Sequence, residues 1–342
     1  MKKLTLLLLA LLYVTLTYAY TERDLLQKQA DINRLKEILV LDRQWVTYPD
    51  YNDRAGWDRF LGTFKDEYIR RGEKRLNYQW QVVKATDYLA FERTGNRQIM
   101  EKPFGANNGA IADLLMAELA EGKGRFVDQL INGVFNACEM TSWALAAHII
   151  VQPSHRALPA YDYPVIDLTS GDLGGLLAWT YHFMRPSFDK VDPEISRRLR
   201  HELQTRILDP YMNNDSFWWM GRNYNGRMLN NWNPWCNSNA LMCFMLLEDN
   251  RDTLAKAVHL TMESVDKFLN YIKADGACEE GPSYWGHAAG KTLDYLELLS
   301  DITGDKVNIF NEPMIKNMGE YISRSYICLL YTSPSPRDGL LS

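Results

Sequence analysis

The segment from Asp275 to His287 carries the densest group of side chains that can move protons or bind polar ligands. It reads Asp-Gly-Ala-Cys-Glu-Glu-Gly-Pro-Ser-Tyr-Trp-Gly-His. Its glycines and Pro282 predict a rigid turn between two helices, with Pro282 and Ser283 beginning the second helix. Tyr284 then lies in the first helical turn, where the positive end of the helix dipole stabilises a phenolate. A phenolate is the form that a tyrosine needs to act as a general base.

A structural interpretation of this segment is equally well founded on the residues alone. Tyr284 and Trp285 would then close the mouth of a helical domain, and Glu279 and Glu280 would cap a helix. Under the catalytic interpretation, Tyr284 transfers the proton while Glu280 and His287 contact the substrate.

A second segment, Asn230–Trp235, reads Asn-Asn-Trp-Asn-Pro-Trp and follows Arg222. Removing the C5 proton of a uronic acid builds negative charge on the adjacent carboxylate, and fixed hydrogen-bond donors lower that barrier. Neutral amides beside aromatic rings supply such donors without adding an acid. We therefore take the asparagines of this segment as candidate donors to such a carboxylate, and Asn233, Trp235 and Arg222 as candidate substrate contacts. An asparagine-rich turn that satisfies its own backbone explains the same residues, and spacing does not separate the two interpretations.

A third segment, Glu139–His148, falls within a helix predicted to run from Val127 to Ile150. Glu139 and Trp143 are four residues apart and would share a helix face, whereas His148 would point elsewhere. Trp143 is a candidate platform for a sugar ring, and packing in the core explains it as well.

No sequence motif predicts a resident metal or nucleotide. His201-Glu202 lacks the second histidine of the zinc-protease motif, and no P-loop, dinucleotide fingerprint or nucleophile elbow is present. The cysteines before residue 328 have no metal-type spacing. We predict that they are buried thiols, with room for one disulfide. They are Cys138, Cys236, Cys243 and Cys278.

Helical periodicity dominates the elements that must position these segments. Apolar residues recur at i, i+3, i+4 and i+7, and convincing strand alternation is absent. Helix pairs joined by long polar and aromatic loops predict an all-α fold, an (α/α) toroid or a related helical array, in one domain over residues 20–327. The predicted helices are Tyr78–Arg93, Asn107–Glu121, Val127–Ile150, Asp167–Phe183, Val191–Ile207, Ser238–Leu247, Leu254–Ile272 and one around Leu293–Leu299 that ends at Gly304.

The two ends of the chain are predicted to be additions to that domain. Residues 1–19 combine a charged start, an apolar run from Leu4 to Leu16 and small residues near Ala19, which is typical of a secretory signal peptide. The run is shorter than the roughly 20 residues that span a bilayer. We expect cleavage before Tyr20, secretion into the periplasm and no membrane span afterwards. Residues 328–342 resemble a translated sequencing adapter, so we predict a foreign tail there that interrupts the native chain.

The charge balance limits the classes of partner. The formal net charge of −5 argues against nucleic acid and gives no global attraction for a polyanion. An acidic substrate therefore needs a locally basic site. Ten tryptophans and nineteen tyrosines provide flat rings that suit the faces of sugars.

Four segments together resemble the heparinase II/III-like polysaccharide lyases, in a form common in gut Bacteroidetes. They are Asn136–Trp143, Asp167–Asp172, Asn230–Asn237 and Asp275–Gly290. The similarity extends from about residue 42 to residue 327. The Glu-Gly-Pro-Ser-Tyr-Trp-Gly core of the last segment is the most specific part.

The resemblance implies an incomplete (α/α) toroid followed by an antiparallel β-sandwich, which the chain as given would lack by truncation. It implies cleavage of acidic glycosaminoglycans, such as heparin and heparan sulfate, by β-elimination. Tyr284 is implied as general acid, and as base for one uronic epimer, and the region of Asn231 as the group that neutralises the carboxylate. Relatives carry Asn-His where this chain has Asn231-Trp232, so no histidine role carries over there. A catalytic histidine, and in some relatives a structural zinc, belong to the β-sandwich, so we expect the chain alone to be inactive and to hold no cofactor.

Two other functions fit the same residues. A glycoside hydrolase would use two acids from among Asp275, Glu279 and Glu280, with their carboxyl groups about 5–5.5 Å or 6.5–9.5 Å apart. A non-catalytic periplasmic glycan-binding protein would bind oligosaccharide without turnover. A lyase differs from both because its product carries a conjugated double bond that absorbs ultraviolet light. The sequence leaves open the uronic epimer, the sulfation pattern, endo or exo action and the oligomeric state.

Overall fold

The computed structural model describes residues 22–223, 228–278, 280–328 and 331–332. Regular structure in these ranges is almost entirely helical, which confirms the all-α prediction. The only strands in these ranges are β1 (Tyr326–Cys328) and β2 (Tyr331–Thr332), which pair antiparallel. The predicted signal peptide lies outside the described residues, as does the predicted foreign tail apart from residues 328, 331 and 332.

The chain divides into two compact units, each built from separated segments. Unit 1 takes the chain up to Leu39, the segment Trp218–Ser238 and the chain from Ala255 onward. Unit 2 takes Val40–Phe217 and Asn239–Leu254.

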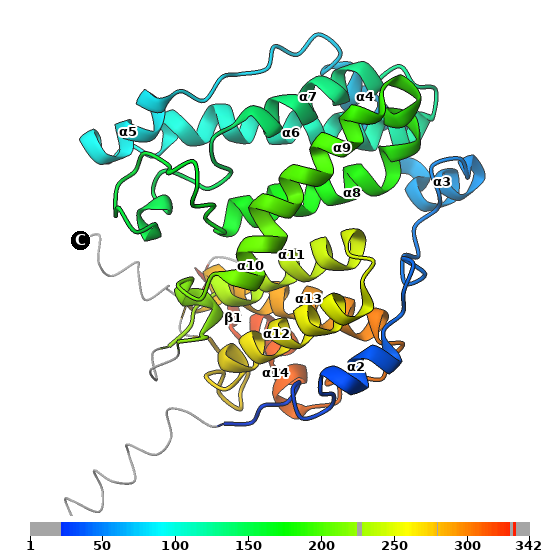
Figure 1. Cartoon of the computed structure of the whole chain (residues 1–342). Coiled ribbons are helices and arrows are strands. Elements are labelled where there is room, and N and C mark those ends of the chain that lie inside the picture. The colour runs from blue at the N-terminus through cyan, green and yellow to red at the C-terminus, as the bar shows by residue number, and fades with distance from the viewer. Residues whose placement is uncertain (1–21, 224–227, 279, 329–330, 333–342) are drawn as a thin grey trace, which may run out of the picture. The chain divides into compact units, whose positions relative to one another are not determined.

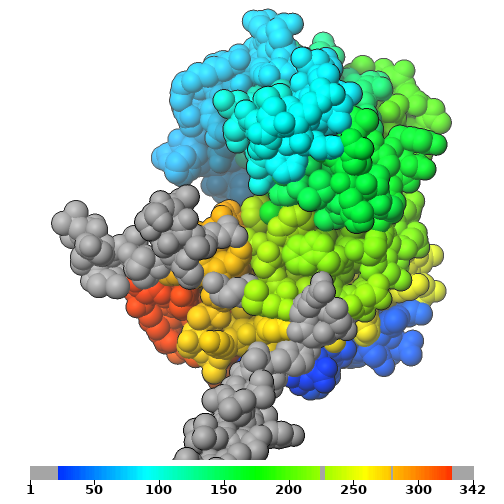
Figure 2. Space-filling model, turned by 90° about the vertical axis from the view of Figure 1, so that its left-hand side faces the viewer, coloured from blue at the N-terminus to red at the C-terminus, as the bar shows by residue number. Residues whose placement is uncertain are grey.

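The helices of unit 2 pack through their apolar faces. Helix α6 contacts α4, α5 and α7, and α9 contacts α7 and α8, as Figure 1 shows. Helix α5 lies at the surface of this unit, coloured cyan in Figure 2. The helical elements are α3 (Arg54–Leu61), η1 (Gly62–Phe64), α4 (Lys65–Glu73), α5 (Ala85–Thr94), α6 (Gln98–Glu121), α7 (Val127–Glu139), η2 (Ile149–Val151), α8 (Leu168–Val191), α9 (Pro193–Leu203), η3 (Gln204–Leu208) and α10 (Asp209–Asn213).

Unit 1 has its core between α12 and α13, where the Thr261 Oγ1 atom and the Tyr295 hydroxyl lie 2.9 Å apart among buried apolar side chains. The N-terminal segment of the described chain packs on α12, because the backbone N–H groups of Leu26 and Gln27 donate to the Asp266 carboxylate. The helical elements are α2 (Ile32–Ile38), η4 (Trp218–Met220), the first turns of α11 (Trp232–Leu247), most of α12 (Arg251–Leu269), η5 (Pro282–Tyr284), η6 (Gly286–Gly290), α13 (Lys291–Ile302) and α14 (Pro313–Arg324).

Several predicted helices were wrong at one end: for example, α8 runs on to Val191 instead of ending at Phe183, and α11 begins at Trp232 instead of Ser238. The helix predicted to reach Ile150 stops at Glu139, and Met140 is extended with a ψ of 138°. Side chains from other elements take over the carbonyl groups there: Trp143 Nε1 donates to Ala137 O, and Arg206 donates to Cys138 O and Thr141 O. Glu139 and Trp143 therefore do not share a helix face.

The helix predicted from Tyr78 begins only at Ala85. The side chain of buried Asn107 pairs with the backbone of Gln81, accepting from its N–H at 3.0 Å and donating to its carbonyl at 2.7 Å. This pairing holds the segment before Ala85 in an extended conformation. Helix α6 also begins earlier than predicted, at Gln98, with Pro103 inside its early turns.

Candidate functional site

Tyr284 lies in the first turn of a helical run, as the sequence predicted. The run begins with η5, continues through Trp285 and the π turn η6, and becomes α13. Gly281 precedes it with a φ of 67°, a conformation that favours glycine because a Cβ would be strained there. Pro282 then supplies the first helical position, where its missing N–H costs nothing.

The loop before Tyr284 is fixed against α14. Gly276 has a φ of 80°, and a Cβ added to it would lie 2.2 Å from the backbone nitrogen of Met318. Trp285 Nε1 donates to the Met318 carbonyl at 2.9 Å, and Asn317 Nδ2 donates to the Ala274 carbonyl at 2.8 Å. These close contacts hold the turn that delivers Tyr284.

Three rings that the sequence singled out come together in unit 1. The Trp235 and His287 rings stack with centroids 4.7 Å apart at 11°, and the Tyr284 ring centroid lies 5.9 Å from that of His287. Tyr284 and Trp235 are half-buried, and His287 is exposed. We call Tyr284, His287 and Trp235 the ring cluster.

Lys291 lies beside the ring cluster and was not among the residues predicted from the sequence. Its Nζ atom lies 5.8 Å from the centroid of the Trp235 ring and 3.3 Å from the Asp294 carboxylate. The spacing of His287 and Lys291, four residues apart, was a usable signal, because such residues share a helix face. Lys291 places a positive charge beside the ring cluster, and its ion pair with Asp294 offsets part of that charge.

Two asparagines at the start of α11, Asn231 and Asn233, differ in the hydrogen bonds that their side chains make. Asn233 is fully buried, and its Nδ2 group donates to Trp219 O, Ser264 O and Ser264 Oγ at 2.7 to 3.1 Å. These bonds use both of its N–H groups, so the structure favours a packing role for Asn233 over the predicted contact with substrate. Asn231 is 5% exposed, and its side-chain amide makes no hydrogen bond within the described part of the chain. Its amide is therefore available to a ligand.

Asn231 and the ring cluster lie at the N-terminal ends of two helices, α11 and the helical run that begins at Pro282. Asn231 precedes α11 directly, its carbonyl accepts from Trp235 N at 3.2 Å, and Trp235 lies one turn further along. The Trp235–His287 stack brings this start against the helical run that begins at Pro282. The N-termini of helices carry partial positive charge, although Trp232 N and Asn233 N at the start of α11 already donate to Asn230. With Lys291, this part of unit 1 suits an anionic ligand despite the negative net charge of the chain.

The remaining predicted contacts are spread over both units. Arg222, two residues after η4, and Glu280, next to Gly281, are half-buried residues of unit 1. Trp143 belongs to unit 2, is 2% exposed, and has the Arg206 guanidinium 5.1 Å from its ring centroid. A buried ring under an arginine is not an open platform, so packing explains Trp143 better than the predicted stacking on sugar.

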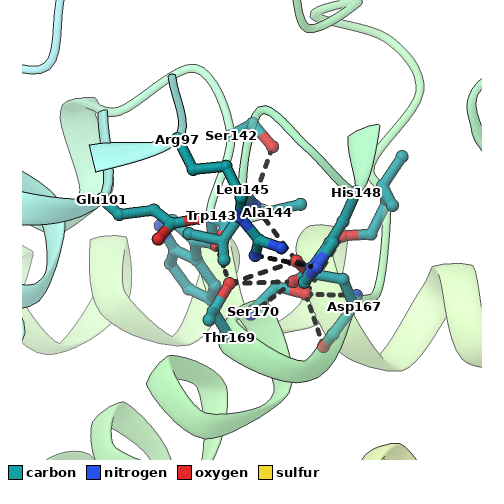
Figure 3. Close-up of polar contacts among 11 residues, drawn as sticks. Arg97, Glu101, Ser142, Trp143, Ala144, Leu145, His148, Asp167, Thr169 and Ser170 are labelled. Carbon is teal, nitrogen blue, oxygen red and sulfur yellow. Dashed lines mark hydrogen bonds and ion pairs between the residues drawn. The ribbon is translucent and has the colours of Figure 1, made fainter. Parts of the chain in front are cut away.

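Asp167 organises a polar network in unit 2 that sequence reasoning did not find (Figure 3). Its fully buried carboxylate caps α8 through Ser170 N at 2.8 Å and accepts from Leu145 N at 3.1 Å. His148 Nδ1 lies 2.7 Å from the same carboxylate, and His148 Nε2 lies 3.3 Å from the Arg97 guanidinium. Because no local pattern links residues 145 and 148 to residue 167, only the folded chain reveals this network.

None of the cysteines before residue 328 forms a disulfide within the described chain. Cys138, Cys236 and Cys243 are buried as predicted, whereas Cys278 is only half-buried because it lies in the loop before η5. Burial raises the pKa of the Cys138 and Cys243 thiols to about 12, so both stay protonated at neutral pH.

Residues 22–223, 228–278, 280–328 and 331–332 contain no group of three His, Cys, Asp or Glu side chains that could hold a metal ion. In the same part of the chain no helix is long and apolar enough to cross a membrane. Neither a comparison with protein-family models nor one with curated proteins finds a match to this chain.

Proposed function

We propose that this chain is the helical part of a secreted polysaccharide lyase that cleaves acidic glycosaminoglycans by β-elimination at a uronic acid. The observation that carries the proposal is the ring cluster: a half-buried tyrosine in the first turn of a helix, beside a histidine that stacks on a tryptophan. The motif resemblance supports it, since the most specific matching segment is the one that delivers Tyr284. The family's arrangement, an incomplete (α/α) toroid with a β-sandwich after it, belongs to the same proposal.

The chemistry assigns one role to each group. The Tyr284 phenolate takes the proton from C5, the C5–H electrons form the C4–C5 double bond, and the C4–O bond breaks. The leaving oxygen then takes a proton from the Tyr284 hydroxyl, so the tyrosine ends in its starting state. The amide of Asn231 and the two helix starts stabilise the charge that develops on the carboxylate. Trp235 and Lys291 hold the sugar face and an acidic group.

Absorbance of the product tests the reaction class. The chain, together with the β-sandwich that the proposal places after it, is incubated with heparin, heparan sulfate and other glycosaminoglycans, and the ultraviolet absorbance of a conjugated uronic acid is followed. A lyase gives rising absorbance with every bond cleaved. New reducing ends without absorbance would mean a hydrolase, and binding without new ends would mean a glycan-binding protein. Either result would overturn the proposal.

A further inference from the structure

Unit 2 contains a pocket that the proposed lyase chemistry does not use. Its volume is about 160 Å³, and it lies between the loop after α7, the loop before α8 and the π turn η3. We call it the η3 pocket. This volume is below the roughly 300 Å³ at which sites for drug-sized ligands begin, so the pocket suits one small ring. The polar side chains of its wall that matter here are Thr141, Ser142, Tyr161, Tyr163, Thr205 and Arg206.

The wall of the η3 pocket is rigid. The π turn interrupts the run from α9 to α10, and such turns occur often at functional sites. Arg206 in this turn donates to Glu202 Oε2 at 2.5 Å and to Thr141 O at 3.1 Å, which ties the turn to the loop after α7. The Asp167 network holds the far end of that loop through Leu145 and His148 (Figure 3).

The chemistry of the wall favours an uncharged, hydroxyl-rich ligand. The Thr205 hydroxyl donates to His201 O and the Tyr163 hydroxyl is bonded to Ser216 and Asn214, so the hydroxyl groups offered to a ligand are those of Thr141, Ser142 and Tyr161. Glu202 pairs with both Arg206 and Arg198, and Arg198 also pairs with Glu139, so two positive and two negative charges balance one another at this wall. Tyr163 is oriented, because its hydroxyl lies 2.6 Å from Ser216 Oγ and accepts from Asn214 Nδ2 at 2.9 Å.

Tyr161 is the second feature of the η3 pocket that suits a sugar. It lines the η3 pocket and is 87% exposed, more than the other exposed large apolar or aromatic side chains in the described chain. A ring left in water at the edge of a polar pocket provides a flat apolar face. The C–H face of a sugar ring matches such a surface while its hydroxyls match the wall.

We propose that the η3 pocket binds one uncharged sugar residue, with Tyr161 against its apolar face. This inference goes beyond the proposed lyase activity and does not depend on it. It assigns unit 2 a role in holding glycan.

Binding of monosaccharide probes to this chain tests the proposal. Glucose, N-acetylglucosamine and glucuronate are offered singly, and saturation transfer from the protein to the sugar is measured by NMR across a concentration series. We expect the uncharged sugars to bind at millimolar concentrations and glucuronate to bind more weakly. Tyr161→Ala should weaken binding roughly three- to tenfold, comparable to the loss of one aromatic contact. Phe64→Ala is the matched control, because Phe64 is 67% exposed in the same unit and does not line the pocket.

Each result of this experiment counts for or against the η3 pocket. Binding that Tyr161→Ala weakens and Phe64→Ala leaves unchanged supports the proposal. No binding, a preference for glucuronate, or equal effects of the two variants would overturn it. Because the readout is binding and not turnover, a chain without lyase activity could still pass the test, and an active lyase could fail it.

Discussion

At the scale of single residues, the hydroxyl of Tyr284 separates catalysis from packing. Tyr284→Phe keeps the ring beside His287 and removes only the group that moves the proton. General acid–base groups contribute about 10²–10⁴-fold, so turnover should fall at least about a hundredfold while substrate affinity stays nearly constant. The measurement is kcat and KM from product absorbance, with the chain and its proposed β-sandwich acting on a confirmed substrate. Near-normal kcat in this variant would leave Tyr284 with a structural role.

Asn231 and Asn233 form a matched pair of buried asparagines two residues apart. Asn231→Ala should slow turnover by about 10²-fold, as loss of one donor to a developing charge does, with little change in stability. Asn233→Ala should instead lower the free energy of unfolding by about 1–3 kcal/mol, because the carbonyls of Trp219 and Ser264 lose their donor. Kinetics and urea unfolding of both variants distinguish these effects. Reversed behaviour would exchange the roles given to the two residues.

The sequence predicted the position of Tyr284 but not its neighbours. The helix start before Tyr284 could be predicted from local sequence, since Gly281 and Pro282 determine it without distant contacts. The stack of Trp235 on His287 depends on two segments far apart in the chain, and no local pattern encodes it. The same limit explains why Asn233 was predicted to contact substrate, since the carbonyls of Trp219 and Ser264 that hold its amide lie in other elements.

At the scale of elements, periodicity predicted helices well where the apolar face alone decides the structure. Helix α9 begins at Pro193 after the Asp192 cap, inside the predicted range Val191–Ile207, and buries Ile195, Leu199 and Leu203. The prediction failed where polar side chains from other elements bind the backbone. Arg206 and Trp143 end α7, and Asn107 delays α5, because these hydrogen bonds outweigh weak local preference.

A comparison of the helix caps Asp167 and Asp192 measures how much hydrogen bonds to other elements add to the free energy of unfolding. Asp192 caps α9 at the surface through Glu194 N, so Asp192→Ala should cost about 0.5–2 kcal/mol of unfolding free energy. Asp167 caps α8 but also holds Leu145 and His148, and its loss leaves buried donors unpaired. Asp167→Ala should therefore cost about 1–3 kcal/mol more than Asp192→Ala. Urea unfolding of both variants measures the difference, and equal costs would show that Asp167 is only a cap.

At the scale of the whole molecule, the division into two units was not visible in the sequence. No linker-like composition marks the boundaries, and unit 1 is assembled from three separated segments. In unit 1 the N-terminal segment depends on α12: Arg23 N donates to Asn270 Oδ1 at 2.7 Å, and Leu26 N donates to Asp266 Oδ1 at 3.0 Å. The stability of this unit therefore depends on the state of a buried carboxyl group.

Asp266 should make the stability of the protein depend on pH. It is fully buried, and burial, with a smaller contribution from Asp24, raises the pKa of its carboxyl group from 3.8 to about 6, although N–H donation from Gln27 and Leu26 opposes this. Between these two values the folded chain keeps a proton that the unfolded chain has lost. The unfolding free energy contributed by Asp266 must therefore fall as pH rises from about 4 to about 6 and level off above. A pKa shift of this size corresponds to a fall in the unfolding free energy on the order of 3 kcal/mol.

Comparison with Asp266→Asn isolates this effect from the other carboxyl groups that titrate in the same range. The asparagine keeps one acceptor for the backbone N–H groups of residues 26 and 27 but cannot ionise. The unfolding free energy of the natural chain minus that of the variant, measured in urea at intervals from pH 4 to pH 7, should decrease as pH rises. A difference that stays constant would mean that Asp266 ionises alike in both states. An increasing difference would mean that its backbone hydrogen bonds stabilise the carboxylate more than burial destabilises it.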